Sequence, residues 1–155
     1  MKHIIILCSL DTKGTEAQYL RDRINEKGMN SILLNTGFGG RAAVQGDISS
    51  GEVARAGGGD IDLLRASSDT GTASRIMTEG AAKIIKALLE KKQCDGVVAF
   101  GGVSNTTLST NIMKTLPFGV PKLMVSSAAS MPAYAAKFIG TADITMMHSV
   151  VDISG

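Results

Sequence analysis

The sequence has no tryptophan, few aromatic residues and only two cysteines. Aromatic residues make up 4% of its 155 residues, so alanine, methionine and aliphatic side chains must fill the core. The cysteines, Cys8 and Cys94, each adjoin an apolar stretch. Two cysteines in core-like positions are too few for a disulfide framework or a cysteine-based zinc site, so we expect both to be buried thiols.

Long hydrophobic runs and an excess of one charge are also missing. The apolar runs fall far short of the roughly 20 residues that cross a bilayer, and the N-terminus lacks a hydrophobic signal segment. We therefore expect no membrane partner and a cytoplasmic location. The net charge of +2 excludes a strongly basic surface, so nucleic acid is not an expected partner.

Glycine, by contrast, is abundant, with 18 residues. Residues 37–70 are rich in it and show only short helical pieces, such as residues 49–57. So long an irregular segment in a compact domain is usually functional, mobile or part of an interface. We therefore predict a homo-oligomer that forms through this segment or through a helix face.

Apolar runs and amphipathic stretches alternate along the rest of the chain. An apolar run at 3–10, an amphipathic helix at 15–27 that Gly28 would close, and a second apolar run at 31–36 predict a βαβ unit. The alternation continues with a helix at 72–92, a strand at 96–100, a helix at 108–116, a strand at 122–127, a short helix within 128–140 and a strand at 142–147. This order predicts one α/β domain over residues 1–155, Rossmann-like and doubly wound, with a mostly parallel sheet of about five strands and helices on both faces. Because no helix follows the last strand, we expect the chain to be a piece of a longer protein.

Residues 101–107, GGVSNTT, stand between a predicted buried strand and a predicted helix. In a doubly wound sheet such a segment lies at the carboxyl edge, where the N–H groups of a helix N-terminus favour an anion such as phosphate. Gly101 and Gly102 would let a ligand approach the backbone, and the polar residues that follow would donate hydrogen bonds: Ser104, Asn105, Thr106 and Thr107. The pattern is neither GxGxxG nor GxxxxGK[ST]. Helix capping by the same polar side chains explains it equally well.

The turn after the first predicted strand, DTKG, offers a second set of contacts. Lys13 could reach a phosphate, and Asp11 could hold a ribose hydroxyl or, through water, Mg²⁺. Thr12 and Gly14 complete this turn. The alternative is that Asp11 or Thr12 caps the following helix and Lys13 is solvated. The recurrence of a polar turn at two equivalent strand ends favours binding.

Residues 36–40, TGFGG, follow the second predicted strand. Its glycines, Gly37 among them, permit close backbone approach. Phe38 offers an apolar surface to a nucleotide base or packs in the core, and packing is the favoured reading.

Residue types that usually mark catalysis or a metal form no recognisable pattern. Neither His3 nor His148 has a cysteine, histidine or carboxylate at a metal-ligand spacing, so no such metal site is predicted. Ser126, Ser127 and Ser130 lack the GxSxG elbow, which disfavours a serine-hydrolase triad with His148 and either Asp143 or Asp152. The sequence therefore leaves catalytic residues unassigned.

Several longer segments carry a family resemblance. The ordered series CSLDTKG, RIMTEGAAKIIKALLEKKQCDGVVAFGG, GVPKLMVS and GTADITMMHSVVDI resembles the N-terminal domain of the Tm-1-like ATP-binding family, the uncharacterised protein family UPF0261. The resemblance runs from about residue 4 to the end of the chain. It implies a Rossmann-like domain that binds ATP, with Mg²⁺ as a candidate companion ion, and a second, C-terminal domain in the longer protein.

The resemblance also assigns residues to the nucleotide site. These are the DTKG turn, the strand-end glycines Gly101 and Gly102, and the polar residues after them. Many relatives read GGSGGT or GGSxGT where this chain reads GGVSNTT, so Val103 takes a serine position and Asn105 a glycine position. Asparagine tolerates left-handed backbone better than most residues, so the loop shape can survive the change.

Two functional hypotheses follow from the sequence. The first is a nucleotide-binding regulatory or interaction module without chemistry of its own. The second is the nucleotide-binding half of an ATP-using enzyme that a C-terminal companion domain completes. No carboxylate pair, nucleophile with its base, or metal cluster is visible in the sequence, which favours the first.

Overall fold

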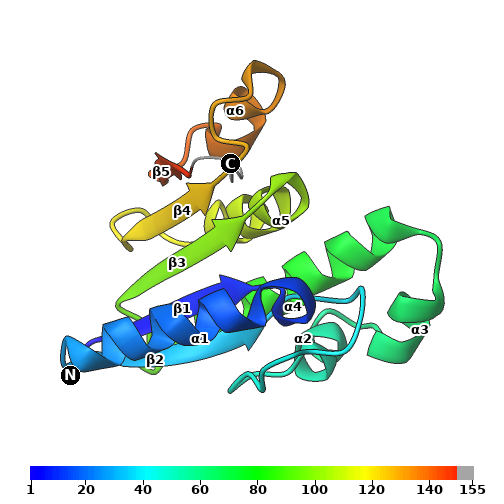
Figure 1. The fold of residues 1–155 in the computed structure, drawn as a ribbon, viewed down its shortest axis with the longest axis horizontal. Helices are drawn as coiled ribbons and strands as arrows, with labels where there is room; N and C mark the ends of the chain where they lie inside the picture. The colour runs from blue at the N-terminus through cyan, green and yellow to red at the C-terminus, as the bar shows by residue number, and fades with distance from the viewer. Residues whose placement is uncertain (150–155) are drawn as a thin grey trace, which may run out of the picture.

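The computed structural model describes residues 1–149 and contains one five-stranded parallel sheet (Figure 1). The strands run in the order β2-β1-β3-β4-β5. Their bounds are β1 His3–Cys8, β2 Asn30–Asn35, β3 Gly96–Gly101, β4 Lys122–Ser126 and β5 Thr145–His148. This architecture confirms the predicted Rossmann-like α/β fold.

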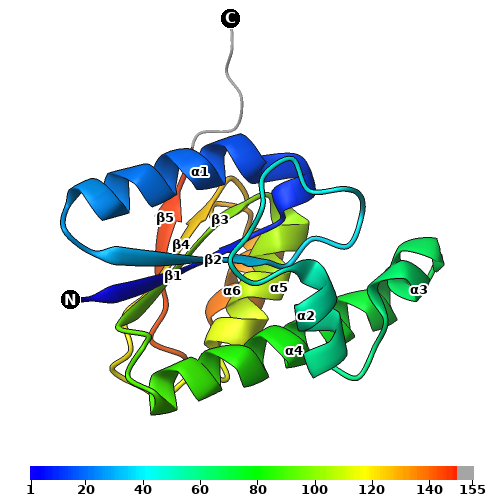
Figure 2. The same cartoon turned by 90° about the horizontal axis from the view of Figure 1, so that it is seen from below.

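Six helices connect or flank the described strands. They are α1 Leu10–Glu26, α2 Ser50–Ala56, α3 Ile61–Ala66, α4 Thr70–Glu90, α5 Val103–Met113 and α6 Pro132–Ile139. Figure 2 shows α1 on one face of the sheet and α2, α4, α5 and α6 on the other. No helix within residues 1–149 is long and apolar enough to cross a membrane.

The strand β1 lies inside the sheet, between β2 and β3, and Ile5, Ile6 and Leu7 of its apolar run are fully buried. Ile5 and Leu7 point into a core formed with α4 and α5, whereas Ile6 points into a smaller core beneath α1. Both faces of a parallel sheet are normally covered, which is why the run is continuous rather than alternating.

Two predicted boundaries between strand and helix were wrong. The first strand ends at Cys8, not at residue 10, and α1 begins at Leu10, not at residue 15. The DTKG segment therefore forms the first turns of α1, with a kink at Lys13, whose φ of −130° and ψ of 25° are not helical. Likewise α5 begins at Val103, not at residue 108. Asp, Ser, Asn and Thr are favoured both in turns and in first helical turns, so composition alone could not separate the two.

Gly28 closes α1 as predicted, because it takes the left-handed conformation, with φ of +75°, just after the helix. Of the glycine-rich segment 37–70, the short helix expected within 49–57 is α2, while α3 was not predicted. A capping box between Ser49 and Glu52 begins α2.

A loop covers the outer edge of β2. The N–H of Ile48 donates to the carbonyl of Leu33 at 3.1 Å, and the N–H of Asn35 donates to the carbonyl of Ile48 at 2.9 Å. Asp47 accepts from the N–H of Leu33 at 2.8 Å and pairs with Arg21 of α1. One of the two sheet edges is therefore protected from pairing with another chain.

Helices α2 and α4 pack with their backbones in contact. A Cβ atom on Gly80 of α4 would lie 1.9 Å from the carbonyl oxygen of Val53 in α2. A Cβ atom on Gly57, just after α2, would lie 2.1 Å from the carbonyl oxygen of Ile76 in α4. Only glycine fits at these two positions, and the contact fixes where α4 lies beneath the sheet.

A buried ammonium group joins the start of β4 to the chain before β5. The Lys122 Nζ atom is fully buried and donates to the carbonyls of Pro117 and Val120 and, at 2.6 Å, to the Asp143 carboxylate. Asp143 also accepts from the N–H of Gly119 at 2.8 Å. The bond from Lys122, with help from Gly119, lowers the pKa of Asp143.

The contact between α2 and α4 predicts a steric effect on stability. Gly80→Ala should lower the free energy of unfolding by about 2–3 kcal/mol, because the backbones must separate. Urea unfolding followed by circular dichroism measures it. Gly51→Ala in α2 is the control, since its Cβ would meet nothing closer than 3.7 Å, and it should leave stability unchanged or raise it by up to about 1 kcal/mol. Equal stabilities for the two variants would refute the packing argument.

The pair of Lys122 and Asp143 predicts a pH-dependent effect. Asp143→Asn should destabilise the chain at pH 7, because the buried ammonium loses its counter-charge. A lowered pKa means that the stabilisation is present above the ordinary aspartate pKa of about 3.9 and is lost as the pH falls through the lowered value. The gap between wild type and variant in urea unfolding should therefore narrow below about pH 4. Asp22→Asn on the exposed side of α1 is the control, and a gap independent of pH would contradict the prediction.

Candidate functional site

The strand order creates a crevice between the carboxyl ends of β1 and β3. The chain leaves β1 for β2 on one side and leaves β3 for β4 on the other, so the connections diverge here. In open α/β sheets ligands bind at such a switch point. A cleft of about 740 Å³ occupies this position, and Figure 1 shows α1 and α5 beginning at this edge of the sheet.

Four segments of the chain line the cleft. The start of α1 provides Ser9, Asp11, Thr12 and Lys13, and the segment after β2 provides Thr36, Phe38 and Gly39. The first turns of α4 provide Thr70, Gly71 and Ser74. The end of β3 and the start of α5 provide Gly101, Gly102, Val103, Ser104, Asn105, Thr107 and Leu108.

The start of α5 presents backbone amides rather than a side-chain cap. Gly102 is the N-cap residue, and no side chain caps the helix there. The first intrahelical bond runs from the N–H of Thr106 to the carbonyl of Gly102 at 2.9 Å. Capping by the SNTT side chains, one of the two predicted readings, is therefore not what the structure shows. The N–H groups of the first turn keep no partner within the helix, as at any helix start.

The polar side chains of this segment divide between the cleft and the core. Thr106 is fully buried, and its hydroxyl lies 2.7 Å from that of Ser126 in β4. The Asn105 amide donates to the carbonyl of Phe100, and Thr107 donates to the carbonyl of Val103 at 2.9 Å. The bond of Asn105 holds the first turn of α5 against the end of β3, that of Thr106 holds it against β4, and that of Thr107 lies within α5.

Position 101 accommodates only glycine, for two reasons. Its φ of +150° is one that L-residues rarely adopt, and a Cβ atom there would lie 2.9 Å from Cβ of Asn105. The turn from β3 into α5 is therefore tight, and the Asn105 side chain occupies the space beside it.

Asp11 ties the start of α1 to the segment after β2. Its Oδ1 accepts from the Ser9 hydroxyl at 2.6 Å, and its Oδ2 accepts from the N–H of Gly39 at 3.1 Å. A Cβ atom on Gly37 would lie 2.7 Å from Asp11 Oδ1, so a larger residue there would displace the Asp11 carboxylate. No side chain caps α1, so the predicted alternative of capping by Asp11 or Thr12 is wrong.

The buried side-chain amide of Asn35 binds the backbone of both the start of α1 and the segment after β2. The Asn35 Oδ1 atom accepts from the N–H of Leu10 at 3.1 Å and from the N–H of Gly37 at 2.9 Å. One side chain therefore sets the position of α1 relative to the 36–40 segment.

Lys13 is the one basic side chain among the described residues that line the cleft. Its ammonium group pairs with Glu16 at 2.9 Å, one turn further along α1, and is partly exposed. This bond lowers the pKa of Glu16. Asp11 is the one carboxylate among the same lining residues.

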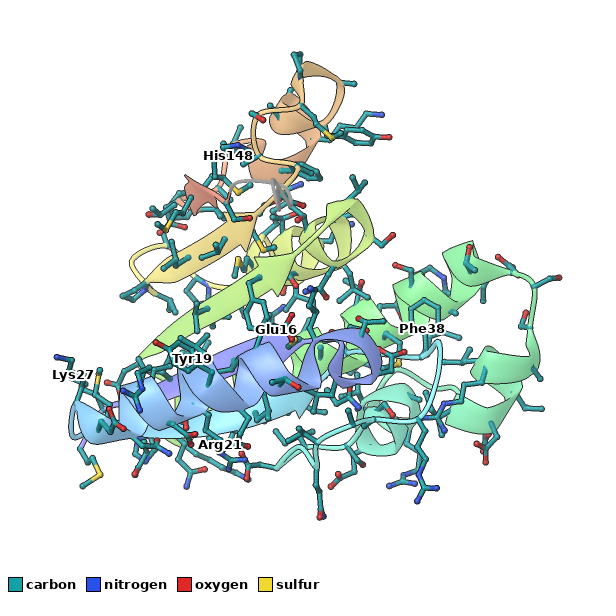
Figure 3. All side chains as sticks on the ribbon, viewed as in Figure 1. Glu16, Tyr19, Arg21, Lys27, Phe38 and His148 are labelled. Carbon is teal, nitrogen blue, oxygen red and sulfur yellow. The ribbon has the colours of Figure 1, made fainter. Side chains whose placement is uncertain are left out.

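Phe38 packs against the core, as the favoured prediction had it. Its ring is partly buried and packs against the core on the α4 side of the sheet, and it also lines the cleft (Figure 3). An aromatic edge is therefore available beside the polar lining.

Nine of the twelve predicted site residues line the cleft. The other three do not: Gly14 packs against Ala43 and Val44, Gly37 lies beneath Asp11, and Thr106 faces the core. The first turn of α4 was missed altogether, although Thr70 and Gly71 stand where its amphipathic pattern begins. Among the other missed residues, Ser9 and Thr36 are polar residues directly after buried strands, which is a usable signal.

The serine-hydrolase triad that the sequence disfavours is not formed with Asp143. Asp143 pairs with Lys122 at the amino ends of the strands, and the Ser126 hydroxyl pairs with Thr106. Asp152 lies outside the described residues. Among residues 1–149 no group of three or more histidine, cysteine or acidic side chains is placed to hold a metal ion.

Both cysteines are free and buried, as predicted. Burial, with a smaller contribution from the charge of Glu16, raises the pKa of Cys8 to about 12. Burial also raises the pKa of Cys94. Although Cys8 lies just below the cleft, its thiol is protonated at neutral pH and does not line the cleft.

Comparison with known proteins identifies relatives along the whole chain. Residues 2–155 match the model of "Uncharacterised protein family (UPF0261) N-terminal domain". A UPF0261 protein of Clostridium tetani is 40% identical over 154 residues, which are 99% of this chain and 38% of the relative. A UPF0261 protein of Rhizobium meliloti is 36% identical over 155 residues, or 37% of its length. The chain thus spans less than two thirds of the length of these relatives.

A plant protein shows a more limited similarity. The ToMV resistance protein Tm-1(GCR237) of Solanum lycopersicum is 33% identical over 85 residues, which are 55% of this chain and 11% of that protein.

The burial of both thiols predicts slow chemical modification. In the folded chain at pH 8, Cys8 and Cys94 should react with a thiol-specific disulfide reagent at least about a hundredfold more slowly than in guanidinium chloride, because each reacts only when the structure opens. Absorbance of the released thiolate measures both rates, and the unfolded chain is the control. Rapid reaction of either thiol in the folded chain would contradict the assigned burial.

Proposed function

The chain belongs to the uncharacterised protein family UPF0261, as its N-terminal domain, and we propose that it binds a nucleotide, first of all ATP, in the cleft between β1 and β3. In this proposal the domain is a regulatory or interaction module. The nucleotide's phosphates lie at the start of α5, and its base lies toward Phe38.

One observation carries the proposal: three helices begin around a single cleft at the switch point of a parallel sheet. The first turns of α1, α4 and α5 all contribute lining residues. Each helix N-terminus carries roughly half a positive charge. The N-cap residues of α1 and α5, Ser9 and Gly102, make no side-chain capping bond, although Asn35 accepts from the N–H of Leu10 in α1, whereas Asp69 caps α4. The start of α5, where no side chain caps the helix, favours an anion most, and the dipoles of α1 and α4 add to it.

The size and lining of the cleft also suit a nucleotide. A volume of about 740 Å³ lies within the usual range for small-molecule sites. Both the apolar ring of Phe38 and the amide-rich start of α5 line it, and a base and a phosphate chain require these two kinds of surface. Lys13 supplies a point charge for the phosphates, and the Asp11 carboxylate offers an acceptor for a ribose hydroxyl.

The residues present also fit a magnesium ion bound together with the phosphates. Mg²⁺ usually takes one or two protein carboxylates, water and phosphate oxygens. Asp11 is the lining carboxylate that could hold it through water, and the ion would neutralise phosphate charge. Because the Asn105 amide is already bonded to Phe100, the donors to phosphate in this proposal are the backbone N–H groups of Gly102, Val103 and Ser104.

A second candidate function follows from the length of the relatives. The chain corresponds to 38% of the clostridial protein, so the larger part of that protein could complete an ATP-using enzyme. The two candidates differ in turnover. The module binds ATP without releasing phosphate, whereas phosphate release that requires the remainder of the relative would favour the enzyme.

The proposed site predicts nucleotide binding that depends on phosphate number. In isothermal titration with nucleotides in the presence of Mg²⁺, ATP should bind more tightly than ADP, and ADP more tightly than AMP. The reason is that the positive ends of the helix dipoles attract a ligand more strongly the more negative charge it carries. Lys13→Ala should weaken ATP binding about tenfold, the usual effect of a lost charged hydrogen bond. Lys27→Ala is the matched control, since Lys27 is exposed at the far end of α1, and it should bind as wild type does (Figure 3).

Two results would refute this proposal. A folded wild-type chain that binds none of the three nucleotides would exclude a nucleotide site in this domain. Saturable ATP binding that is equally strong in the Lys13→Ala and Lys27→Ala variants would place the ligand away from the start of α1.

A further inference from the structure

Half of one sheet face has no helix over it in the described chain. Figure 1 shows α1 in front of β1 and β2, with no helix of residues 1–149 in front of β4 and β5. Contacts agree with this view, because α1 packs on β1 and β2. We name the uncovered part the open face and define it by the side chains that point there: Val98, Phe100, Leu123, Val125, Thr145 and Met147.

The strand register places these side chains in two rows. Phe100, Val125 and Met147 are paired across β3, β4 and β5, and Val98, Leu123 and Thr145 form the row beside them. The neighbouring residues Met124 and Met146 point the other way, into the core on the α4 side. Five of the six side chains on the open face are therefore apolar.

The exposure of these side chains increases away from α1. Val98 is buried, Leu123 and Val125 are intermediate, and Met147 on β5 is 57% exposed. A shallow cleft of about 430 Å³ lies at the amino end of the same strands and is lined in part by Val98, Leu123 and Thr145. The open face is thus a hollowed apolar surface rather than a single exposed residue, which usually marks an interaction site.

A parallel sheet favours a helix as the cover for such a face. All-parallel sheets occur almost only with helices on both faces, and here α2, α4, α5 and α6 lie on the other face. Two strand spacings separate β3 from β5, about 10 Å in all, which matches the 10–12 Å diameter of one helix with its side chains. The five residues of β4 would be spanned by a helix of about eleven residues.

We propose that the open face is the docking surface for an amphipathic helix from the part of the protein that lies beyond this domain in its longer relatives. The matched region is the N-terminal domain and only 38% of the clostridial relative, so a further segment of the same polypeptide is available to cover the face in such proteins. The helix lies beside α1 and packs an apolar stripe on Leu123, Val125 and Met147. This interface is separate from the nucleotide cleft and does not depend on the proposed function.

Cysteine labelling can test the docking surface directly. The single variants Met147→Cys and Thr145→Cys are made in two proteins: the 155-residue chain, and a fusion in which the chain is followed by the part of the clostridial relative beyond its matched 154 residues. Both positions are exposed in the chain, so the substitutions should not affect folding. Leu63→Cys is the control, because Leu63 is 71% exposed on α3, away from the open face.

We expect the introduced thiols at 145 and 147 to react with maleimide about tenfold or more slowly in the fusion than in the chain, because a covered group reacts only when its cover opens. The control thiol at 63 should react at the same rate in both. Equal rates at 145 and 147 in a fusion that unfolds cooperatively would overturn the proposal. Protection in the 155-residue chain that grows with its concentration would also overturn it, because a second copy would then be the occupant.

Discussion

Parallel pairing of all five strands is the constraint on which the rest of this structure depends. Each strand must re-enter the sheet from the same edge, so each connecting helix begins near the carboxyl ends of the strands. Because of this topology the starts of α1 and α5 lie close together, although residues 10 and 103 are far apart in the sequence. The cleft is thus a consequence of topology, and its electrostatic character comes from backbone dipoles more than from charged side chains.

Close backbone approach makes this arrangement compact. The glycines at 57 and 80 let α2 and α4 touch, which carries α4 under the sheet and its first turn to the cleft. On the cleft side, the glycine at 37 leaves room for the Asp11 carboxylate, and Gly101 allows the tight turn into α5. A Cβ atom at Gly57 or Gly80 would force the two helices apart, and one at Gly101 would strain the backbone, so glycine is a packing requirement at these three positions rather than a sign of flexibility.

The cleft and the open face share the strand β3. Phe100 directs its side chain to the open face, while its carbonyl accepts from Asn105 at the start of α5. The next residue, Gly101, lines the cleft. A single strand end therefore supports two surfaces of different chemistry, a polar one at the edge of the sheet and an apolar one on its face. The protected edge at β2 contrasts with β5, whose outer side has no such cover among residues 1–149.

The sequence alone determined the strands, the class of fold and most of the cleft lining, because buried parallel strands are continuous apolar runs and the polar segments after them share one edge. It could not determine where α1 and α5 begin, since the residues of DTKG and GGVSNTT suit a turn and a first helical turn equally well. Three features were decided only by the tertiary structure: the Thr106 hydroxyl faces Ser126, the start of α4 lines the cleft, and one face of β4 and β5 has no helix of residues 1–149 over it. Each of these depends on contacts between segments distant in the sequence, which local propensity does not encode.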